Sequence, residues 1–387
     1  DRSVSRGLGD VYKRQLLNSA KFYHREFDGI RKQIRAVMKL PDVKILDRNQ
    51  AVADIVINEF LQRGKFIQDN NYPYFFPDDS KHIIPLVNNN EEFRILLNRM
   101  GVNAAKDFYP FVAEELRAFC RINGIKIETY NSCYYDSKNF AIYLFNNDSI
   151  VYKIMADNIE TLENGDEGVL FNFRPEHEPF EFVETDENKD YFKEHVLDYM
   201  NLDESGILSS DEQKELLRTW TMATFFNSIM PSKVILAAIG EKGSGKTSTL
   251  RRLGIIFYGS KYNVAPLPTK ADDFDALITN SHLAILDNVD TGTSWLNDKL
   301  ASVSTGQTIP KRELYTDMKL LKFDTRTFIG VTSRTPQFTR DDVADRLICI
   351  NFKRIKDEKG DDSFIPENDL MPVSYTHLRA HETLSDL

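Results

Sequence analysis

Cysteine is scarce in this chain. Cys120, Cys133 and Cys349 are the three cysteines among 387 residues, and no two of them form a Cys-x-x-Cys pair. Neither a disulfide framework nor a zinc site built on paired cysteines is indicated, and a reducing, cytoplasmic compartment fits best. No run of 18 apolar residues occurs, and the first 30 residues lack the apolar core of a signal peptide. These absences argue against a membrane protein.

Basic residues are outnumbered, and their distribution is uneven. The chain has 49 Lys and Arg against 59 Asp and Glu, a formal net charge of −10, which argues against a wholly basic nucleic-acid-binding protein. Between Asp157 and Glu215 there are 19 acidic residues and 4 basic ones. Between Ala301 and Lys356 there are 11 basic residues and 6 acidic ones. The sequence therefore predicts a local positive field in the later part of the chain.

One glycine-rich motif carries most of the functional information. The segment Gly240–Thr247 reads Gly-Glu-Lys-Gly-Ser-Gly-Lys-Thr and directly follows the apolar run Val234–Ile239. The residues after it have apolar side chains at helical spacing, namely Leu250, Leu253 and Phe257. This order of strand, loop and helix is typical of a phosphate-binding loop. The alternative is a glycine turn that binds no nucleotide.

The residue types in the loop match the chemistry of a nucleoside triphosphate. Glycines let the backbone wrap around an anion with its N–H groups pointing inward, Lys246 can reach the β- and γ-phosphates, and the Thr247 hydroxyl can hold Mg²⁺. The predicted nucleotide-binding residues are Gly240, Gly243, Ser244, Gly245, Lys246, Thr247 and Ser248.

A second apolar run ends in an acidic residue. Leu283–Leu286 is followed by Asp287, about 40 residues beyond Lys246, which is the arrangement of an ATPase strand whose terminal aspartate holds Mg²⁺. Thr247 and Asp287 are therefore the predicted metal ligands. Asn288 stands where a glutamate usually orients the attacking water; it can orient water but cannot accept its proton. Asp290 is a possible substitute.

Two further elements complete the predicted catalytic set. The apolar run Thr327–Val331 is followed by Thr332 and Ser333, where a polar side chain can sense the γ-phosphate. Arg340 and Arg346 precede the apolar run Leu347–Phe352, and an arginine there can act as a finger in a neighbouring subunit's site. The alternative is an ordinary salt bridge to Asp341, Asp342 or Asp345. The predicted catalytic residues are Lys246, Asp287, Asn288, Ser333 and Arg346.

The predicted organisation is a mixed α and β module over residues 16–155, an acidic connector over 156–208 and an α/β domain over 209–371. Segments 1–15 and 372–387 resemble translated sequencing-adapter tails and are left out of the fold prediction. In the first module we expect helices within 16–66 and over 91–100 and 104–123, a hairpin around Pro77–Ser80, and strands over 125–135, 140–145 and 150–155. Its aromatic side chains favour core packing over base stacking.

The helix that leads to the phosphate-loop strand has its own start signal. Ser210 with Gln213 three residues later predicts a capping box at its beginning.

The run Ser304–Phe352 resembles the ATPase domain of phage and plasmid primase-helicases, the superfamily-three group of ring-forming ATPases. The residues that carry the resemblance are Thr305-Gly306, Ile309, Pro310, Arg312, Leu314-Tyr315-Thr316-Asp317, Phe323, Ser333, Pro336 and Asp345-Arg346-Leu347. The resemblance implies an α/β, AAA-like P-loop NTPase that uses ATP and Mg²⁺, forms a homo-hexamer and moves on single-stranded DNA, with a primase domain or partner. It also implies that Lys311, Arg312 and Lys319 lie on or beside a hairpin that grips the DNA backbone.

Two departures from the family pattern leave another class of function open. Ser333 stands where asparagine is usual, and Asn288 stands where an acidic residue is usual. Asn288 favours a nucleotide-dependent switch or scaffold ATPase that binds ATP without moving along DNA. A small-molecule phosphotransferase is a third reading, but no lid-like arginine cluster or acceptor-site signature supports it.

Overall fold

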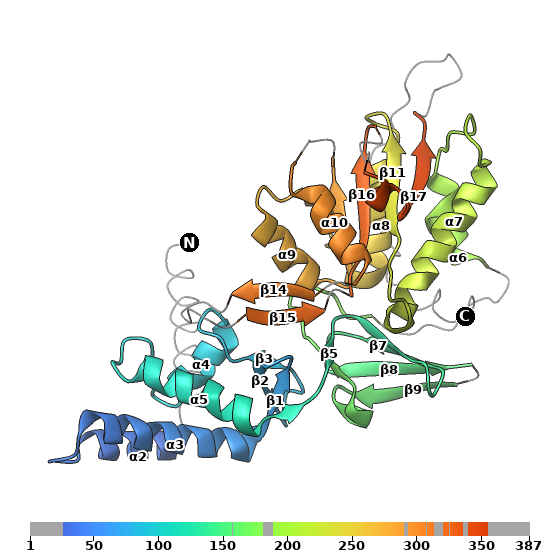
Figure 1. Ribbon diagram of the computed structural model, residues 1–387. Coiled ribbons are helices and arrows are strands. Elements are labelled where there is room, and N and C mark those ends of the chain that lie inside the picture. The colour runs from blue at the N-terminus through green and yellow to red at the C-terminus, as the bar shows by residue number, and fades with distance from the viewer. Residues whose placement is uncertain are drawn as a thin grey trace, which may run out of the picture. The chain divides into compact units, whose positions relative to one another are not determined.

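The computed structural model of the chain (Figure 1) divides into two compact units, Asp1–Glu128 and Thr129–Leu387, called the N-terminal and C-terminal units below. The residues that the structure describes are 26–156, 158–180, 189–289, 293–306, 308–312, 320–324, 326–335 and 340–354. Both segments predicted to be non-native tails, 1–15 and 372–387, lie outside the described residues.

The N-terminal unit combines helices with a small sheet of strand order β3-β2-β1-β4. Its elements are α2 (Asp28–Met38), α3 (Ile45–Arg63), β1 (Gly64–Asp69), β2 (Tyr72–Pro77), β3 (Ile84–Pro85), α4 (Glu91–Arg99), α5 (Tyr109–Asn123) and β4 (Ile125–Lys126). The predicted helices are confirmed, although α5 begins five residues later than expected.

A tight hairpin in this unit was not predicted. Asn70 and Asn71 both have positive φ, 48° and 67°, and link the antiparallel strands β1 and β2. A two-residue turn with positive φ at both positions suits asparagine and matches the twist of the paired strands. The hairpin predicted around Pro77–Ser80 is also present, because β2 pairs with β3 in antiparallel fashion. The core beside these strands contains the aromatic side chains Phe60, Phe66 and Phe75.

The C-terminal unit is built on a five-stranded parallel sheet of order β12-β13-β16-β11-β17. The strands and helices of this part are α7 (Ser210–Ala223), β11 (Ile235–Gly240), α8 (Lys246–Tyr258), β12 (Ala265–Pro266), α9 (Ala271–Asn280), β13 (Leu283–Asp287), α10 (Leu296–Ser304), β14 (Thr308–Arg312), β15 (Leu320–Asp324), β16 (Phe328–Ser333), α11 (Asp341–Ala344) and β17 (Leu347–Phe352). The predicted strands before and after the glycine-rich loop are confirmed.

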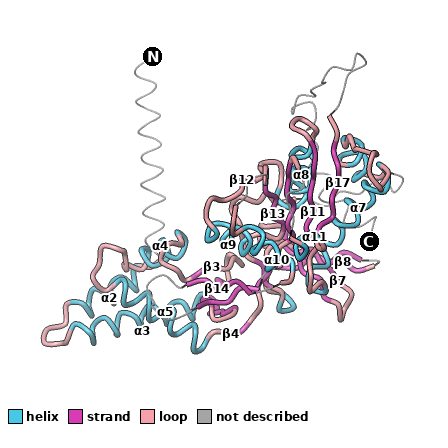
Figure 2. The backbone as a smooth tube through the Cα atoms, turned by 45° about the horizontal axis from the view of Figure 1, so that its top comes forward, coloured by secondary structure: helices cyan, strands magenta, loops and turns pink. Residues whose placement is uncertain are grey.

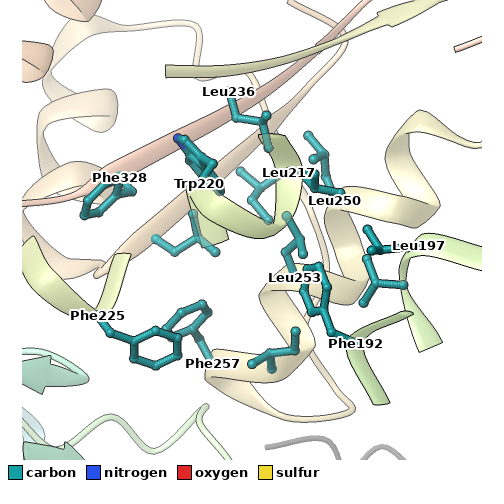
Figure 3. Close-up of a cluster of buried hydrophobic side chains, with 14 of the residues drawn as sticks. Phe192, Leu197, Leu217, Trp220, Phe225, Leu236, Leu250, Leu253, Phe257 and Phe328 are labelled. Carbon is teal, nitrogen blue, oxygen red and sulfur yellow. The ribbon is translucent and has the colours of Figure 1, made fainter. Parts of the chain in front are cut away.

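Helices cover both faces of the parallel sheet. On one face, Leu236 and Ala238 of β11 share a core with α7 and α8 (Figure 3). On the other face, Ile235, Ala237 and Ile239 share a core with α9 and α10. Side chains of a strand alternate between faces, so the continuous apolar run of β11 is what burial on both sides requires. Figure 2 shows the strands of this sheet between the two layers of helices.

A small antiparallel sheet belongs to the same unit. It has the order β6-β7-β8-β9, with β6 (Cys133–Asp136), β7 (Ala141–Phe145), β8 (Ile150–Met155) and β9 (Asn158–Glu163). Ile142, Leu144 and Ile154 lie in the same core cluster as Trp220 of α7. Residues 129–155, which were predicted to belong to the N-terminal module, are instead part of the C-terminal unit. Two short strands flank this sheet in the sequence, β5 (Thr129–Tyr130) before it and β10 (Leu170–Phe171) after it, and they pair in parallel.

Much of the acidic segment 156–208 is folded rather than an exposed connector. Beyond β9, a 3-10 turn (Asp166–Gly168), α6 (Tyr191–His195) and a second 3-10 turn (Leu197–Tyr199) are formed. Phe192 and Leu197 are buried in the core that α7 and α8 share (Figure 3). Leu202 then forms an isolated antiparallel bridge with Phe352, so the segment covers the exposed edge of β17. Most of the acidic residues that the structure describes in this segment, such as Glu163, Asp166 and Asp198, are exposed.

The capping box of α7 is present but lies one residue earlier than predicted. Ser209 is the N-cap; its hydroxyl accepts from the Glu212 N–H, and the Glu212 carboxylate accepts from the Ser209 N–H at 2.8 Å. Gln213, expected to close the box, is buried instead and accepts a hydrogen bond from Asn351 N–H of β17 at 2.8 Å. The prediction of Ser210 with Gln213 was therefore wrong by one position.

Candidate nucleotide site

The glycines of the loop meet specific backbone needs. Gly240 ends β11 with φ of 154°, and a side-chain carbon there would collide with the carbonyl oxygen of Phe352 in β17. Gly243 and Gly245 have φ of 81° and 87°, a region that residues with a side chain rarely adopt. Gly245 is also the N-cap of α8, so the loop runs directly into a helix N-terminus. Free N–H groups at that end favour an anion.

Lys246 lies inside this loop. Its Nζ donates to the carbonyl oxygens of Gly240 and Glu241, both at 2.6 Å, and lies 3.4 Å from the Ser244 hydroxyl. The side chain is buried. Ser244 in turn donates to the Glu241 carbonyl at 2.9 Å. Phosphate oxygens of a bound nucleotide would therefore compete with these carbonyl oxygens for the ammonium group.

The structure brings together the two predicted metal ligands. Thr247 Oγ1, at the start of α8, donates to Oδ1 of Asp287, at the end of β13, at 2.8 Å. A hydroxyl and a carboxylate are oxygen ligands of the kind that Mg²⁺ takes alongside water and substrate phosphates. No cluster of three or more His, Cys, Asp or Glu side chains suited to a metal occurs among the described residues. The donor set fits a metal held largely by a phosphate ligand rather than a closed protein cage.

A third residue, Thr332, also contacts Asp287 and was not among the predicted site residues. Thr332 Oγ1 donates to the same Asp287 Oδ1 at 2.6 Å and accepts the Asn288 N–H at 2.8 Å. Ser333, the predicted sensor, donates instead to the carbonyl of Thr335 at 2.6 Å. The pairing of Leu286 with Val331 in β13 and β16 sets Asp287 beside Thr332 rather than Ser333. Neither strand's sequence alone determines the register between them, so the sequence could not show whether Thr332 or Ser333 lies beside Asp287.

Asn288 has an unusual backbone conformation. Its φ is 56°, in the left-handed region, and its side chain is exposed. It borders a cavity of about 520 Å³ beside Asp287. The residues that line this cavity are Val264, Pro266, Leu267, Pro268, Thr269, Asp287, Asn288 and Thr293. Asp290, named as a possible catalytic substitute, lies outside the described residues.

The two arginines before β17 have different surroundings. Arg340 pairs with Asp298 and, at 2.6 Å, with Asp342, which is the salt-bridge alternative raised from the sequence. Arg346 instead donates to the carbonyl of Ala301 at 3.3 Å and lies 3.4 Å from the Ser304 hydroxyl, at the C-terminal end of α10. The role of Arg346 in a neighbouring subunit's site stays a prediction.

The expected hairpin is formed between α10 and β16. β14 and β15 are antiparallel, with Lys311 opposite Leu321 and Arg312 opposite Leu320. The hairpin leads into the amino end of β16, whereas Thr332 lies at its carboxyl end, so the hairpin and the loop belong to opposite ends of that strand. Only the backbone of Lys311 and Arg312 is described, and Lys319 lies outside the described residues.

Two of the cysteines are buried structural residues. Burial raises the pKa of the Cys120 thiol to about 11 and raises the pKa of Cys133 as well. Cys133 Sγ lies 3.3 Å from Nε2 of His282, whose pKa burial lowers to about 4. Both partners are therefore neutral near pH 7, and neither thiol has the lowered pKa of a nucleophile. The described helices include none that is long and apolar enough to cross a membrane.

Comparison with known proteins gives one family match. Residues 207–378 match a family described as actinomycete integrative conjugative element replication protein. The match covers less than half of the chain and ends within the segment 372–387. No curated protein matches the chain.

Solved structures show only distant likeness. The apo structure of the NrS-1 C terminal region is 10% identical, with a TM-score of 0.44 over 84% of this chain and 67% of that one. The X-ray structure of JCV Helicase is 12% identical, with a TM-score of 0.26 over 36% of this chain and 39% of that one. This chain thus spans well under half of that helicase structure. The family match is the more informative finding, and it makes residues 207–378 similar to replication proteins of integrative conjugative elements.

Proposed function

We propose that this chain contains the ATP-hydrolysing motor of a mobile-element replication protein and acts on DNA as a helicase or translocase. The observation that carries the proposal is the hydrogen bond between Thr247 and Asp287 at the mouth of the glycine-rich loop. Two residues 40 positions apart thereby form the hydroxyl and carboxylate pair that a magnesium–nucleotide complex needs. The match to replication proteins over residues 207–378 supports the replication context.

In this proposal each residue has a defined task. The N–H groups of the loop and of the first turn of α8 bind the phosphates, and Lys246 exchanges the loop carbonyls for phosphate oxygens. Thr247 and Asp287 would hold Mg²⁺, which would supply neutralisation of phosphate charge. Asn288 carries no group that can accept a proton at neutral pH. The base that activates water therefore comes from elsewhere, or hydrolysis is slow.

The DNA-binding part of the proposal rests on the hairpin. Lys311 and Arg312 lie in β14, and Lys319 lies between β14 and β15 in the chain. Lys and Arg contacts to phosphate provide most non-specific affinity for nucleic acid. We further propose assembly into a homo-hexamer, with Arg346 contributing to a neighbour's site and a primase domain or partner acting with it.

A second candidate function has a specific observation in its favour. The exposed, proton-inert side chain of Asn288 suits a switch or scaffold ATPase that binds ATP and changes state without translocating. Such a protein would not need DNA to hydrolyse ATP.

The rate of ATP hydrolysis with and without single-stranded DNA separates the two functions. We expect single-stranded DNA to raise turnover several-fold in the parent, and Lys246→Ala to lose both nucleotide binding and hydrolysis because the loop loses its phosphate-facing cation. A rate of ATP hydrolysis that does not change when DNA is added would favour the switch. If a folded Lys246→Ala variant bound nucleotide with unchanged affinity, the assignment of the nucleotide site would be wrong.

A further inference from the structure

We propose that Thr332 and the backbone of Asn288 form a clamp that fixes the Asp287 carboxylate, and that Asn288 serves the site through its main chain rather than its side chain. This inference rests on the proposed function and gives it two positioning residues. Neither residue needs to touch the nucleotide to act.

The direction of the hydrogen bonds makes the Thr332 hydroxyl a fixed donor. A hydroxyl has one proton and two lone pairs. Because Thr332 Oγ1 accepts the Asn288 N–H at 2.8 Å, its proton points to Asp287 Oδ1 at 2.6 Å. Thr332 is 2% exposed, so water does not compete for this proton. If the Thr332 side chain turned about χ1, its oxygen would leave the Asn288 N–H without this partner, which is costly.

The left-handed conformation of Asn288 directs the N–H of the residue that follows it. Asn288 has φ of 56°, and the next N–H, that of Val289, donates to the Thr332 carbonyl at 2.8 Å. Two successive N–H groups thereby clasp Thr332 from both its side chain and its main chain. Asparagine is among the few residues that adopt this conformation readily, whereas a residue such as glutamate is disfavoured there. The conformation therefore favours asparagine over glutamate at this position.

The clamp leaves one carboxylate oxygen available. Oδ1 of Asp287 accepts from both Thr247 and Thr332. Within the described part of the chain, no hydrogen bond reaches Oδ2. A carboxylate held at one oxygen by two hydroxyls presents the other in a fixed direction, which is the preorganisation that a metal-bound water needs. Loss of the clamp should therefore weaken Mg²⁺ binding more than nucleotide binding.

Replacing Thr332 tests the hydroxyl. We measure binding of a fluorescent ATP analogue in EDTA and across a Mg²⁺ titration, together with kcat and KM for ATP. Thr332→Val should raise the Mg²⁺ concentration for half-maximal hydrolysis by about tenfold, the scale of one hydrogen bond to a charged group, and lower kcat. Binding in EDTA should not change, and Thr332→Ser should restore most of the Mg²⁺ response. Equal losses in EDTA and in Mg²⁺ would indicate general damage and overturn the clamp.

Replacing Asn288 tests the backbone independently, should the valine variant fail to fold. Glycine keeps access to the left-handed region and alanine does not, so Asn288→Gly should need less Mg²⁺ than Asn288→Ala, by about 5- to 30-fold. A side-chain role predicts equal losses in the two variants, and that result would overturn the inference. If the parent shows no Mg²⁺-dependent nucleotide binding, the proposed function fails as well. If the parent binds normally and Thr332→Val behaves like it, only the clamp fails.

Discussion

At the scale of single residues, the site depends on side chains that lie far apart in the sequence and meet at the end of one sheet. Lys246, Thr247 and Asp287 were predicted from motif and spacing, and the structure places Thr247 and Asp287 in contact. Thr332 could not be predicted, because its role depends on which hydroxyl the register of β16 sets beside β13. The polar pair at the end of β16 was visible in the sequence, whereas the choice within the pair was not.

Asp287→Asn is the residue-scale prediction. The amide keeps the shape of the carboxylate but loses the charge that holds Mg²⁺, so nucleotide binding should largely persist while hydrolysis falls by roughly two orders of magnitude. Steady-state ATPase assays measure the loss of hydrolysis, and equilibrium binding on the same preparation measures nucleotide affinity. Asp273→Asn is the matched control, because it makes the same change at an exposed residue in the first turn of α9. An equal loss in the control would mean that the effect is not specific to Asp287.

At the scale of elements, the apolar strands were the most predictable part. A run such as Leu283–Leu286 must be buried on both faces, and β13 forms there. Boundaries and short turns were less predictable. The strand β1 was not predicted, and its first three residues fall in the range 16–66 where helices were expected; the turn that follows it consists of two asparagines with no glycine. The start of α7 was displaced because two adjacent serines each precede an acidic or amide residue at the capping spacing.

The adjacent serines give an element-scale prediction with an internal control. Ser209→Ala removes the N-cap hydroxyl and should destabilise the C-terminal unit by about 1 kcal/mol. Ser210→Ala, inside the first turn, should change stability by less than about 0.5 kcal/mol. Thermal unfolding followed by tryptophan fluorescence reports both, because Trp220 is buried on α7 and the second tryptophan, Trp295, lies at the start of α10 in the same unit. A larger effect for Ser210→Ala than for Ser209→Ala would contradict the cap seen here.

The hairpin gives a second prediction at this scale. Each phosphate contact contributes about 0.7 to the slope of log affinity against log salt for a single strand, so Lys311→Ala with Arg312→Ala should flatten that slope by about 1 to 1.5. The loss should be similar for all sequences, since backbone contacts do not read bases. Basal ATP hydrolysis should survive, while its stimulation by DNA falls.

A charge-matched control separates a contact from a change in net charge. Lys32→Ala with Arg35→Ala removes two exposed basic side chains from α2 and should leave the salt slope nearly unchanged. Equal effects of the two double variants would mean that the hairpin is not the DNA contact.

At the scale of the whole molecule, the sequence indicated an α/β domain after a mixed module, but not where one ends. The structure divides the chain at Glu128 and Thr129. The small sheet β6-β7-β8-β9 and the acidic segment after it bury Ile142, Leu144 and Phe192 in the core that supports α8. Composition pointed to a connector because acidic residues greatly outnumber basic ones in this segment, yet several of its apolar residues are buried in the core.

Assembly is tested by mixing variants. If Arg346 completes a neighbour's site, Arg346→Ala chains and Lys246→Ala chains are each inactive alone, but mixed oligomers contain some sites with one intact half from each. ATP hydrolysis of the mixture should then exceed that of either variant. Arg340→Ala serves as the comparison, because Arg340 is paired with Asp298 and Asp342 of its own chain. If Arg340→Ala chains restored ATP hydrolysis when mixed with Lys246→Ala chains, and Arg346→Ala chains did not, the residue that acts in the neighbour's site would be Arg340.

The central claim is that this chain converts ATP hydrolysis into movement along DNA. The most direct measurement is ATP-dependent displacement of streptavidin from a biotinylated single strand. The account predicts displacement with ATP and Mg²⁺ that is absent from the Lys246→Ala and Asp287→Asn variants and reduced in the Lys311→Ala, Arg312→Ala variant. ATP hydrolysis by the parent on that strand without any displacement would contradict the account and identify the protein as a nucleotide-dependent switch.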